Sequence, residues 1–279
     1  MFLRVTRSQW RFLGISLAIL TASATEPASA ANLKFVSWNV LYGFNHHRSI
    51  KEASSWLQDQ NPAVVAFQEL NGFSEQRLRE CAAEWGHAHA VTHKQGGFPV
   101  GLTSSQPIEV IERAFKGFHH GFLHCKTHGI HVFVVHFWPG KYSEVNEILD
   151  RASKLVDQKH KVLIAGDFNG CSRRDESFLK QNATLRERDY TFVDRVEAKG
   201  FVDLVYKHDP GAKVSCPSPI TIPRWSKDLA ELKAKRYRID FVFADGSFSS
   251  FSQSATISMD GIIDKVSDHY PVIVEVAIP

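Results

Sequence analysis

The sequence predicts an α/β protein in which two β-sheets pack face to face, with helices on the outside. Continuous apolar runs of strand length, such as residues 162–166, alternate with segments that have helical apolar spacing. Residues 88–137 instead contain short runs rich in Val, Phe, Ile and Thr, separated by Gly and Pro, which is typical of a meander of strands. The sequence shows no internal repeat and no low-complexity block.

We predict strands at continuous apolar runs, and helices where apolar residues have helical spacing and capping residues mark the ends. Ser74 is a candidate N-cap for one helix, while Gly86 and Gly200 follow two helices as stop signals. Residues 206–236 are polar and carry four prolines, so we expect a long loop with one helical turn. The expected strands are residues 33–39, 63–67, 97–103, 108–115, 122–127, 130–137, 162–166, 237–244, 248–257 and 272–278, and the expected helices are 48–60, 74–85, 143–158 and 189–199.

The first 30 residues have the composition of a secretory signal peptide. Arg4, Arg7 and Arg11 precede a short apolar core at residues 12–20, and Ala28-Ser29-Ala30 has small residues before a cleavage point. The core is shorter than the ~20 residues that a membrane-spanning helix needs, so we do not expect a stable membrane anchor. The prediction is therefore a periplasmic or secreted protein with a single domain over residues 31–279, most simply a monomer.

Net charge and cysteine count say less about function than the motifs do. The formal net charge is +3, but the leader holds three Arg and one Glu, which leaves 30 basic against 29 acidic residues. A mature chain this close to neutral has no charge footprint for nucleic acid. Its four cysteines are an even number in an exported chain, which favours a disulfide between Cys171 and Cys216. Buried free thiols are the alternative.

Polar residues stand directly beside six apolar runs, where the ends of strands would bring them to the rim of a sheet. Magnesium prefers oxygen ligands such as these, whereas zinc favours more His or Cys. A divalent cation with two histidines and several carboxylates suits phosphoester hydrolysis, because the cation offsets phosphate charge and a base activates water. The residues are Asn39, Glu69, His136, Asp167, Asn169, Asp240, Asp268 and His269.

The motifs around these residues resemble those of the endonuclease/exonuclease/phosphatase superfamily, which includes deoxyribonuclease-I-like nucleases. The resemblance covers the chain from Leu33 to its end, with the motifs in the family's order. It implies a four-layer αββα sandwich and a phosphoester hydrolase dependent on Mg²⁺ or Mn²⁺. The motifs are WN at 38–39, QE at 68–69, VVH at 134–136, GDFN at 166–169, RIDFVF at 238–243 and SDHYPV at 267–272.

The resemblance also implies a role for each residue. Glu69 would be the principal metal ligand, with Asn39 beside it and Asp268 as a further carboxylate. His136 and Asn169 would hold the scissile phosphate. Asp240 would orient His269 and stabilise its charged form. Asp167 and His269 are rival candidates for activating water, of which Asp167 is favoured, with His269 binding phosphate or acting as an acid.

The substrate stays open at this point. Nucleic acid is the first expectation, a lipid head group or small phosphorylated metabolite is the second, and an inactive binding module is the third. A basic stretch around Trp225, from Arg224 to Arg236, favours nucleic acid through charge and stacking. Gln106 replaces an arginine that members often have before Pro107-Ile108, and His136 is followed by an unusual Phe137-Trp138-Pro139, so substrate contacts are expected to differ.

Overall fold

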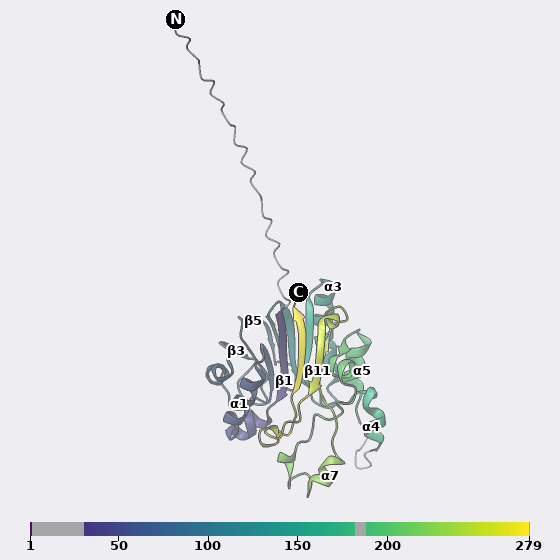
Figure 1. Cartoon of the computed structure of the whole chain (residues 1–279). Helices are drawn as coiled ribbons and strands as arrows, with labels where there is room; N and C mark the ends of the chain where they lie inside the picture. The colour runs from purple at the N-terminus through teal and green to yellow at the C-terminus, as the bar shows by residue number, and fades with distance from the viewer. Residues whose placement is uncertain (2–30, 182–187, 279) are drawn as a thin grey trace. The chain divides into compact units, whose positions relative to one another are not determined.

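Two six-stranded β-sheets face each other in the computed structural model, which describes residues 1, 31–181 and 188–278 (Figure 1). Both are mixed sheets, because β1 pairs with β2 and β7 with β8 in parallel, while the other described pairs are antiparallel. In spatial order, the first sheet is β11 (Ser252–Ile257), β12 (Val272–Ile278), β1 (Ala31–Asn39), β2 (Val64–Gln68), β4 (Gly101–Ser104) and β3 (His89–Thr92). The second is β5 (Glu109–Ala114), β6 (Phe122–Thr127), β7 (Ile130–His136), β8 (Lys161–Asp167), β10 (Asp240–Ala244) and β9 (Val202–Asp203).

Helices cover the outer faces of both sheets, so the predicted four-layer αββα sandwich is confirmed. Parallel strand pairs need a crossover, and α1 and α3 supply the two that lead from β1 to β2 and from β7 to β8. The helices are α1 (Ile50–Gln60), α2 (Glu75–Ala82), α3 (Tyr142–Asp157), α4 (Glu176–Gln181), α5 (Thr191–Ala198), α6 (Leu204–His208) and α7 (Leu229–Lys233), with shorter turns at η1 (Leu41–Asn45), η2 (Ala83–Trp85), η3 (Arg173–Asp175), η4 (Pro219–Thr221), η5 (Phe248–Phe251) and η6 (Ile263–Lys265).

The alternation of side chains along each strand decides which residues face the helices and which face the other sheet. Trp38 of β1 packs its ring on Trp56 of α1, with centroids 5.2 Å apart. Phe137, just after β7, stacks on Phe192 of α5 at 4.8 Å. Both rings lie on outer faces. Their neighbours Asn39 and His136 therefore point into the space between the sheets.

Strand β8 is buried on both faces, as its unbroken apolar run predicted. Leu163 and Ala165 belong to the core between the sheets, whereas Val162 and Ile164 pack in the outer core under α3 and α5. After the partly exposed Lys161 at its start, a strand with no solvated face carries apolar or small residues, and the chain becomes polar again only at Asp167. Packing on both faces of β8 therefore places its polar site residue at the end of the strand, at Asp167.

The structure differs from the sequence prediction in several places, and α4, β9 and α6 are elements that were not predicted. The expected strand at 97–103 is only β4, and β3 was not predicted. Residues 248–251 form a 3₁₀ turn, because the Asp245 carboxylate accepts the N–H groups of Ser247 and Phe248 and turns the chain before β11 begins. The long loop also holds more helix than one turn, since α7 and η4 lie within it.

The predicted disulfide is wrong. All four cysteines lie in the described part of the chain and are free thiols. Cys171 and Cys216 both lie in a small buried cluster with Leu179 and Ile239. Burial raises the pKa of the Cys171 thiol to about 12 and that of Cys216 to about 11, which disfavours the thiolate that disulfide exchange requires.

The predicted signal peptide at residues 1–30 lies outside the described residues, apart from Met1. Among the helices of the described ranges, none is long and apolar enough to cross a bilayer.

A buried neutral histidine makes the fold sensitive to acid. His87 bonds to the Pro62 carbonyl through Nε2 and to Thr103 Oγ1 through Nδ1, both at 2.8 Å, and burial lowers its pKa to about 4 from the usual 6.5. As pH falls from 6.5 towards 4, the unfolded chain binds a proton that the folded chain does not. The free energy of unfolding then falls by up to about 1.4 kcal/mol per pH unit for this group.

We therefore expect His87→Gln to flatten the pH dependence of unfolding by about one proton between pH 6.5 and 4. Urea denaturation at a series of pH values measures the slope for the variant and the wild type. The exposed His46, changed to Gln, is the matched control. An unchanged slope in His87→Gln would contradict the prediction.

Candidate active site

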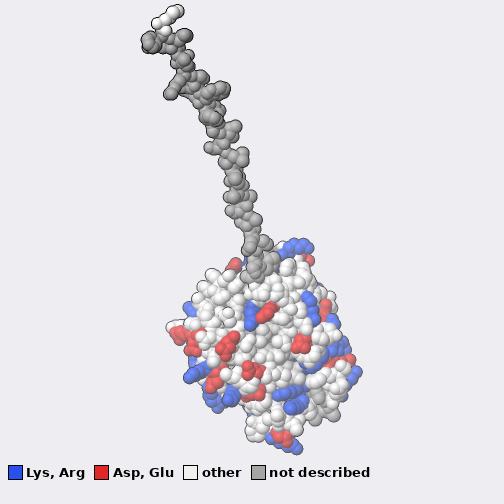
Figure 2. All heavy atoms as spheres, in the orientation of Figure 1, with Lys and Arg blue, Asp and Glu red and all other residues white. Residues whose placement is uncertain are grey.

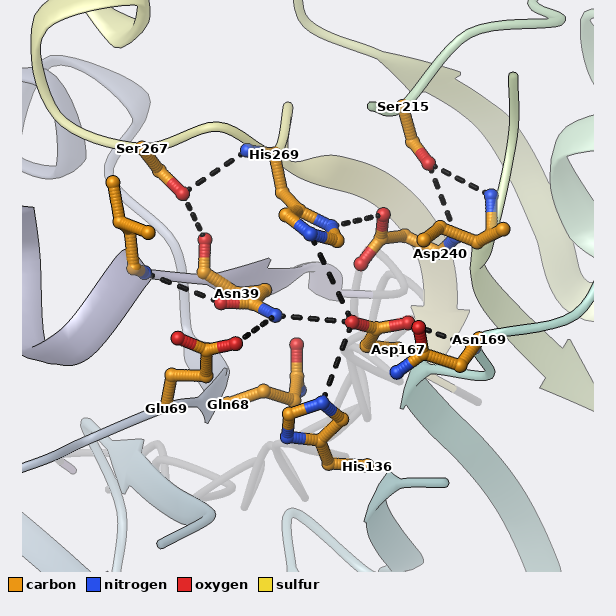
Figure 3. A network of polar contacts seen from close by, with 12 residues as sticks. Asn39, Gln68, Glu69, His136, Asp167, Asn169, Ser215, Asp240, Ser267 and His269 are labelled. Carbon is orange, nitrogen blue, oxygen red and sulfur yellow. Dashed lines mark hydrogen bonds and ion pairs between the residues drawn. The ribbon is translucent and has the colours of Figure 1, made fainter. Parts of the chain in front are cut away.

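Strand register brings the predicted polar residues to one end of the sandwich. In the second sheet, Asp167 at the end of β8 is the paired residue of both His136 on β7 and Asp240 on β10. In the first sheet, Asn39 ends β1 opposite Gln68, and Glu69 follows directly. The Ser267–His269 segment enters β12 at the same end, so the two sheets present their polar ends to each other (Figure 3).

The Asn39 side chain joins the two sheets. Its Nδ2 donates to Asp167 Oδ2 at 3.0 Å and to Glu69 Oε1 at 3.3 Å, while its Oδ1 accepts the Leu41 N–H at 3.2 Å (Figure 3). Asn39 is fully buried, so these partners replace solvent completely. The backbone is held as well, because Ser267 Oγ donates to the Asn39 carbonyl at 2.6 Å.

Asp167 lies at the centre of the network. Its Oδ2 is 3.5 Å from His136 Nε2 and 3.8 Å from His269 Nε2, and its Oδ1 accepts the Asn169 N–H at 2.8 Å. Burial raises the pKa of this carboxyl to about 7, against the opposing effect of His269. Near neutral pH the group can therefore both accept and release a proton.

His269 and Asp240 form a buried pair across the two sheets. His269 Nδ1 is 2.8 Å from Asp240 Oδ2, and Ser215 Oγ accepts the Asp240 N–H at 3.1 Å (Figure 3). Burial acts against the charged imidazole, but Asp240 and the neighbouring acidic groups raise the pKa of His269 well above its usual value. The contact with Asp240 fixes the orientation of the His269 ring.

The two residues expected at the phosphate lie beside Asp167. Burial lowers the pKa of His136 well below its usual value, which keeps its imidazole neutral. Its Nδ1 has no hydrogen-bond partner among the described residues. Asn169 has a left-handed backbone, with φ of 45°, and its Nδ2 donates to the Phe137 carbonyl at 3.0 Å.

Two sets of residues in this network have the donors for a metal ion. Ligand atoms of Asp167, Asp240 and His269 lie within 4.8 Å of one another, but a protonated His269 has no free lone pair to bind a metal. The second set is Glu69 and Asp268, where burial raises both carboxyl pKa values and Asp268 raises that of Glu69 further. Within the described ranges, no lysine or arginine forms an ion pair with either carboxylate. A divalent cation would neutralise them.

A segment of strained backbone, residues 41–47, contacts the Glu69 carboxylate. Residues 41–47 all have positive φ, from 43° to 74°, a conformation that costs about 1–2 kcal/mol per residue outside glycine. Within it, the Tyr42 N–H donates to Glu69 Oε2 at 3.0 Å. Glu69 itself has φ of 60°. The longest run of strained backbone in the described residues therefore lies beside this carboxylate.

Sequence reasoning missed the residues that support the site from behind. Ser215 is fully buried and accepts the N–H groups of Ile239 and Asp240, but a serine in a polar loop carries no signal of its own. Arg238 lies inside the RIDFVF motif, and its buried guanidinium pairs with Asp175 and Asp203, each at 2.7 Å. This pairing anchors η3 and α6 to the start of β10.

Comparison with known proteins adds a sequence family and a set of similar structures. The sequence profile described as the Endonuclease/Exonuclease/phosphatase family matches residues 36–269. No curated protein sequence matches the chain.

Three similar solved structures share 15–19% sequence identity with the chain, which shows a common fold. An AP endonuclease from Archaeoglobus fulgidus has 19% identity and a TM-score of 0.65 over 87% of this chain and 98% of its own. A 3′ phosphatase from Neisseria, bound to a product DNA hairpin, has 17% identity and a TM-score of 0.66 over 88% and 99%. An AP endonuclease from Leishmania major has 15% identity and a TM-score of 0.64 over 95% and 92%.

Removing the Arg238 guanidinium should destabilise the protein strongly. Arg238→Ala leaves Asp203 buried without its partner and Asp175 with Lys213 alone, so we expect a loss of about 3–5 kcal/mol in the free energy of unfolding. Urea denaturation measures the change. Arg173→Ala is the control, because its pair with Asp194 is exposed and contributes about 0–1 kcal/mol. Equal losses in the two variants would show that Arg238 is no anchor.

Proposed function

Because the chain belongs to the endonuclease/exonuclease/phosphatase family, we propose that it is a divalent-metal-dependent phosphodiesterase that cleaves nucleic acid. The observation that carries the proposal is the network in which Asn39 joins Glu69 to Asp167, with His136 and His269 on either side (Figure 3). It combines hard oxygen donors, a proton acceptor and two imidazoles, whose Nε2 atoms lie 3.5 and 3.8 Å from Asp167 Oδ2. Metal-assisted phosphoester hydrolysis uses these three kinds of group.

Glu69 and Asp268 would hold Mg²⁺ or Mn²⁺, with Asn39 beside them. No lysine or arginine of the described chain pairs with their carboxylates, and burial raises both pKa values against the opposing charge of His269. The bound cation would neutralise charge on the phosphate and the leaving oxygen.

Asp167 is our candidate for the base that activates water. Its pKa of about 7 suits proton transfer near neutral pH, and it is acceptor-only when ionised. The rival, His269, is kept protonated by Asp240, so it would bind the phosphate or protonate the leaving oxygen. Neutral His136 and the Asn169 amide would donate hydrogen bonds to phosphate oxygens as negative charge builds up.

Similar folds and the exposed Trp225 favour nucleic acid as the substrate, whereas the pairing of the basic residues limits the contribution of charge. Similar folds occur in proteins whose titles name AP endonuclease activity or bound DNA. The basic loop carries Trp225, which is 46% exposed, but Lys235 is paired with Glu231 and Arg236 donates to the Pro217 carbonyl. Lys/Arg and Asp/Glu side chains also occur together on the face in Figure 2. Phosphate chemistry and stacking, rather than a large basic surface, would have to supply binding.

The same catalytic residues would serve a lipid head group or a small phosphorylated metabolite, which is the second candidate substrate class. The leader at residues 1–30 supports export to the periplasm or the medium as part of the proposal.

A substrate panel tests the activity and its metal dependence. The purified mature protein is incubated with plasmid DNA, RNA, bis-p-nitrophenyl phosphate or sphingomyelin, in Mg²⁺ or Mn²⁺ and again with EDTA. We expect cleavage of nucleic acid and of the diester, and none in EDTA. Cleavage of sphingomyelin alone would contradict nucleic acid as the substrate and support the second substrate class. No metal-dependent cleavage of any substrate would favour a binding module.

Single substitutions test the assigned base. Asp167→Asn keeps the size of the side chain but replaces one acceptor oxygen with an NH2 donor and removes its ability to accept a proton, so we expect kcat to fall by roughly 10²–10⁴. His269→Ala should lower kcat as well, through loss of the charged donor. Asp59→Asn changes an exposed aspartate on α1 and is the control. Near-normal turnover by Asp167→Asn would refute this assignment.

A further inference from the structure

A continuous group of aromatic rings extends from His136 to the surface. His120 stacks on Phe98 with planes 5° apart, and its ring centroid is 4.2 Å from that of His136 in an edge-to-face contact. Phe98 in turn contacts Tyr42 at 5.4 Å. On the other side, His119 stacks on Trp138 at 4.4 Å. We call Tyr42, Phe98, His119, His120 and Trp138 the ring cluster.

The ring cluster is held rigidly by its backbone. The His120 carbonyl accepts hydrogen bonds from His93 Nε2 at 2.8 Å and Lys94 Nζ at 2.6 Å. The His119 N–H donates to the buried Glu144 carboxylate at 2.6 Å. Gly121 has φ of 88°, and a Cβ there would lie 2.2 Å from the Ala114 carbonyl oxygen, so the turn requires glycine. Rings fixed in this way lose little entropy when a ligand binds.

Its inner and outer members differ in accessibility. Tyr42 and Trp138 are 38% and 44% exposed, so both can contact a ligand from solvent. His120 is only 2% exposed, yet neither of its ring nitrogens has a hydrogen-bond partner among the described residues. Burial lowers the pKa of His120 to about 4, so the neutral ring carries one donor and one acceptor. An unpaired buried donor or acceptor costs about 1–3 kcal/mol, which a bound polar ring edge would recover.

We propose that the ring cluster is a subsite that stacks on the nucleobase attached to the scissile phosphate, with His120 hydrogen-bonding to that base. The inference rests on the proposed function, in which His136 holds the phosphate. Contact of His120 with His136 places the cluster next to that phosphate, where the first base of a nucleotide would lie. Stacking on aromatic side chains accepts any base, because every base has a flat π-face.

A quaternary ammonium head group is the main rival ligand for aromatic rings, and the cluster does not suit it. Such a cation needs ring faces turned towards it from several sides. Here the faces of Phe98 and His120 are stacked on each other, as are those of His119 and Trp138. The ammonium group of Lys94 also lies against the His120 carbonyl and would repel a second cation. Within each stacked pair the planes are 5° and 15° apart, and such flat faces favour another flat ring.

Binding without turnover tests the subsite directly. Asp167→Asn/Trp225→Phe protein leaves Trp138 as the one strongly exposed tryptophan of the described chain, since Trp38, Trp56 and Trp85 are buried. Adenosine 5′-monophosphate, ribose 5-phosphate and phosphocholine are titrated in Mg²⁺, and tryptophan fluorescence and calorimetry report binding. Stacking contributes about 1–3 kcal/mol per base, so we expect the nucleotide to bind roughly 5- to 150-fold more tightly than the sugar phosphate and to quench Trp138.

Variants show whether the ring cluster causes the preference. Phe98→Ala and Trp138→Ala, each followed by calorimetry, should bring the nucleotide close to ribose 5-phosphate in affinity, while binding of the sugar phosphate is retained and reports an intact fold. Phe115→Ala is the matched control, because Phe115 precedes the same turn, is 53% exposed and makes no ring contact within the described ranges. A nucleotide preference that survives both substitutions would overturn the proposal.

The outcomes separate this inference from the proposed function. Equal affinity for nucleotide and sugar phosphate, or tighter binding of phosphocholine, would overturn the subsite even if the enzyme cleaves DNA. Conversely, a base preference lost in Trp138→Ala would support the subsite even if no nucleic acid is cleaved. Comparing an oligonucleotide with its abasic counterpart then distinguishes a polymer substrate from a free nucleotide.

Discussion

The hydrogen bonds of the Asn39 amide are the interaction on which the site depends. A sandwich of two sheets buries apolar side chains between its layers, and polar groups there need partners. Asn39 is the last residue of a strand in one sheet and bonds to Asp167 in the other. A second bond across the sandwich joins His269 to Asp240. These two contacts fix the distance between the sheets at the end where the charged residues collect.

Residues next to the site, which would not react themselves, hold the buried charged residues in place. Ser267 fixes the Asn39 carbonyl, Ser215 fixes the Asp240 backbone, and Arg238 with its two aspartates holds the start of β10. Strain is concentrated in residues 41–47, which orient Glu69. Strained backbone persists only where the surrounding structure over-determines it, and such sites commonly serve function. The site is thus preorganised by contacts outside the residues that would react.

Much of the fold followed from the sequence, because burial on both faces gives β7 and β8 the apolar runs 132–135 and 162–166, which stop at His136 and Asp167. Parallel pairing then requires these ends to meet, so the membership of the site was predictable as well. The short strand β3 escaped prediction because its residues, HAVT, gain strand geometry only from pairing with β4. The turn at Phe248 depends on one hydrogen-bonding carboxylate, Asp245, and the paired rings of the ring cluster come from loops far apart in sequence. Contacts of these kinds carry no periodic signal.

In the proposed function, the two sides of the site have different roles. Glu69 and Asp268 bind the metal, and Asp167 transfers the proton. Anomalous diffraction from a crystal soaked in Mn²⁺ tests this division most directly. We expect one strong anomalous peak in contact with carboxylate oxygens of Glu69 and Asp268, at roughly 2.1 Å, beside Asn39. A peak held instead by Asp167, Asp240 and His269, or no peak at saturating Mn²⁺, would contradict it.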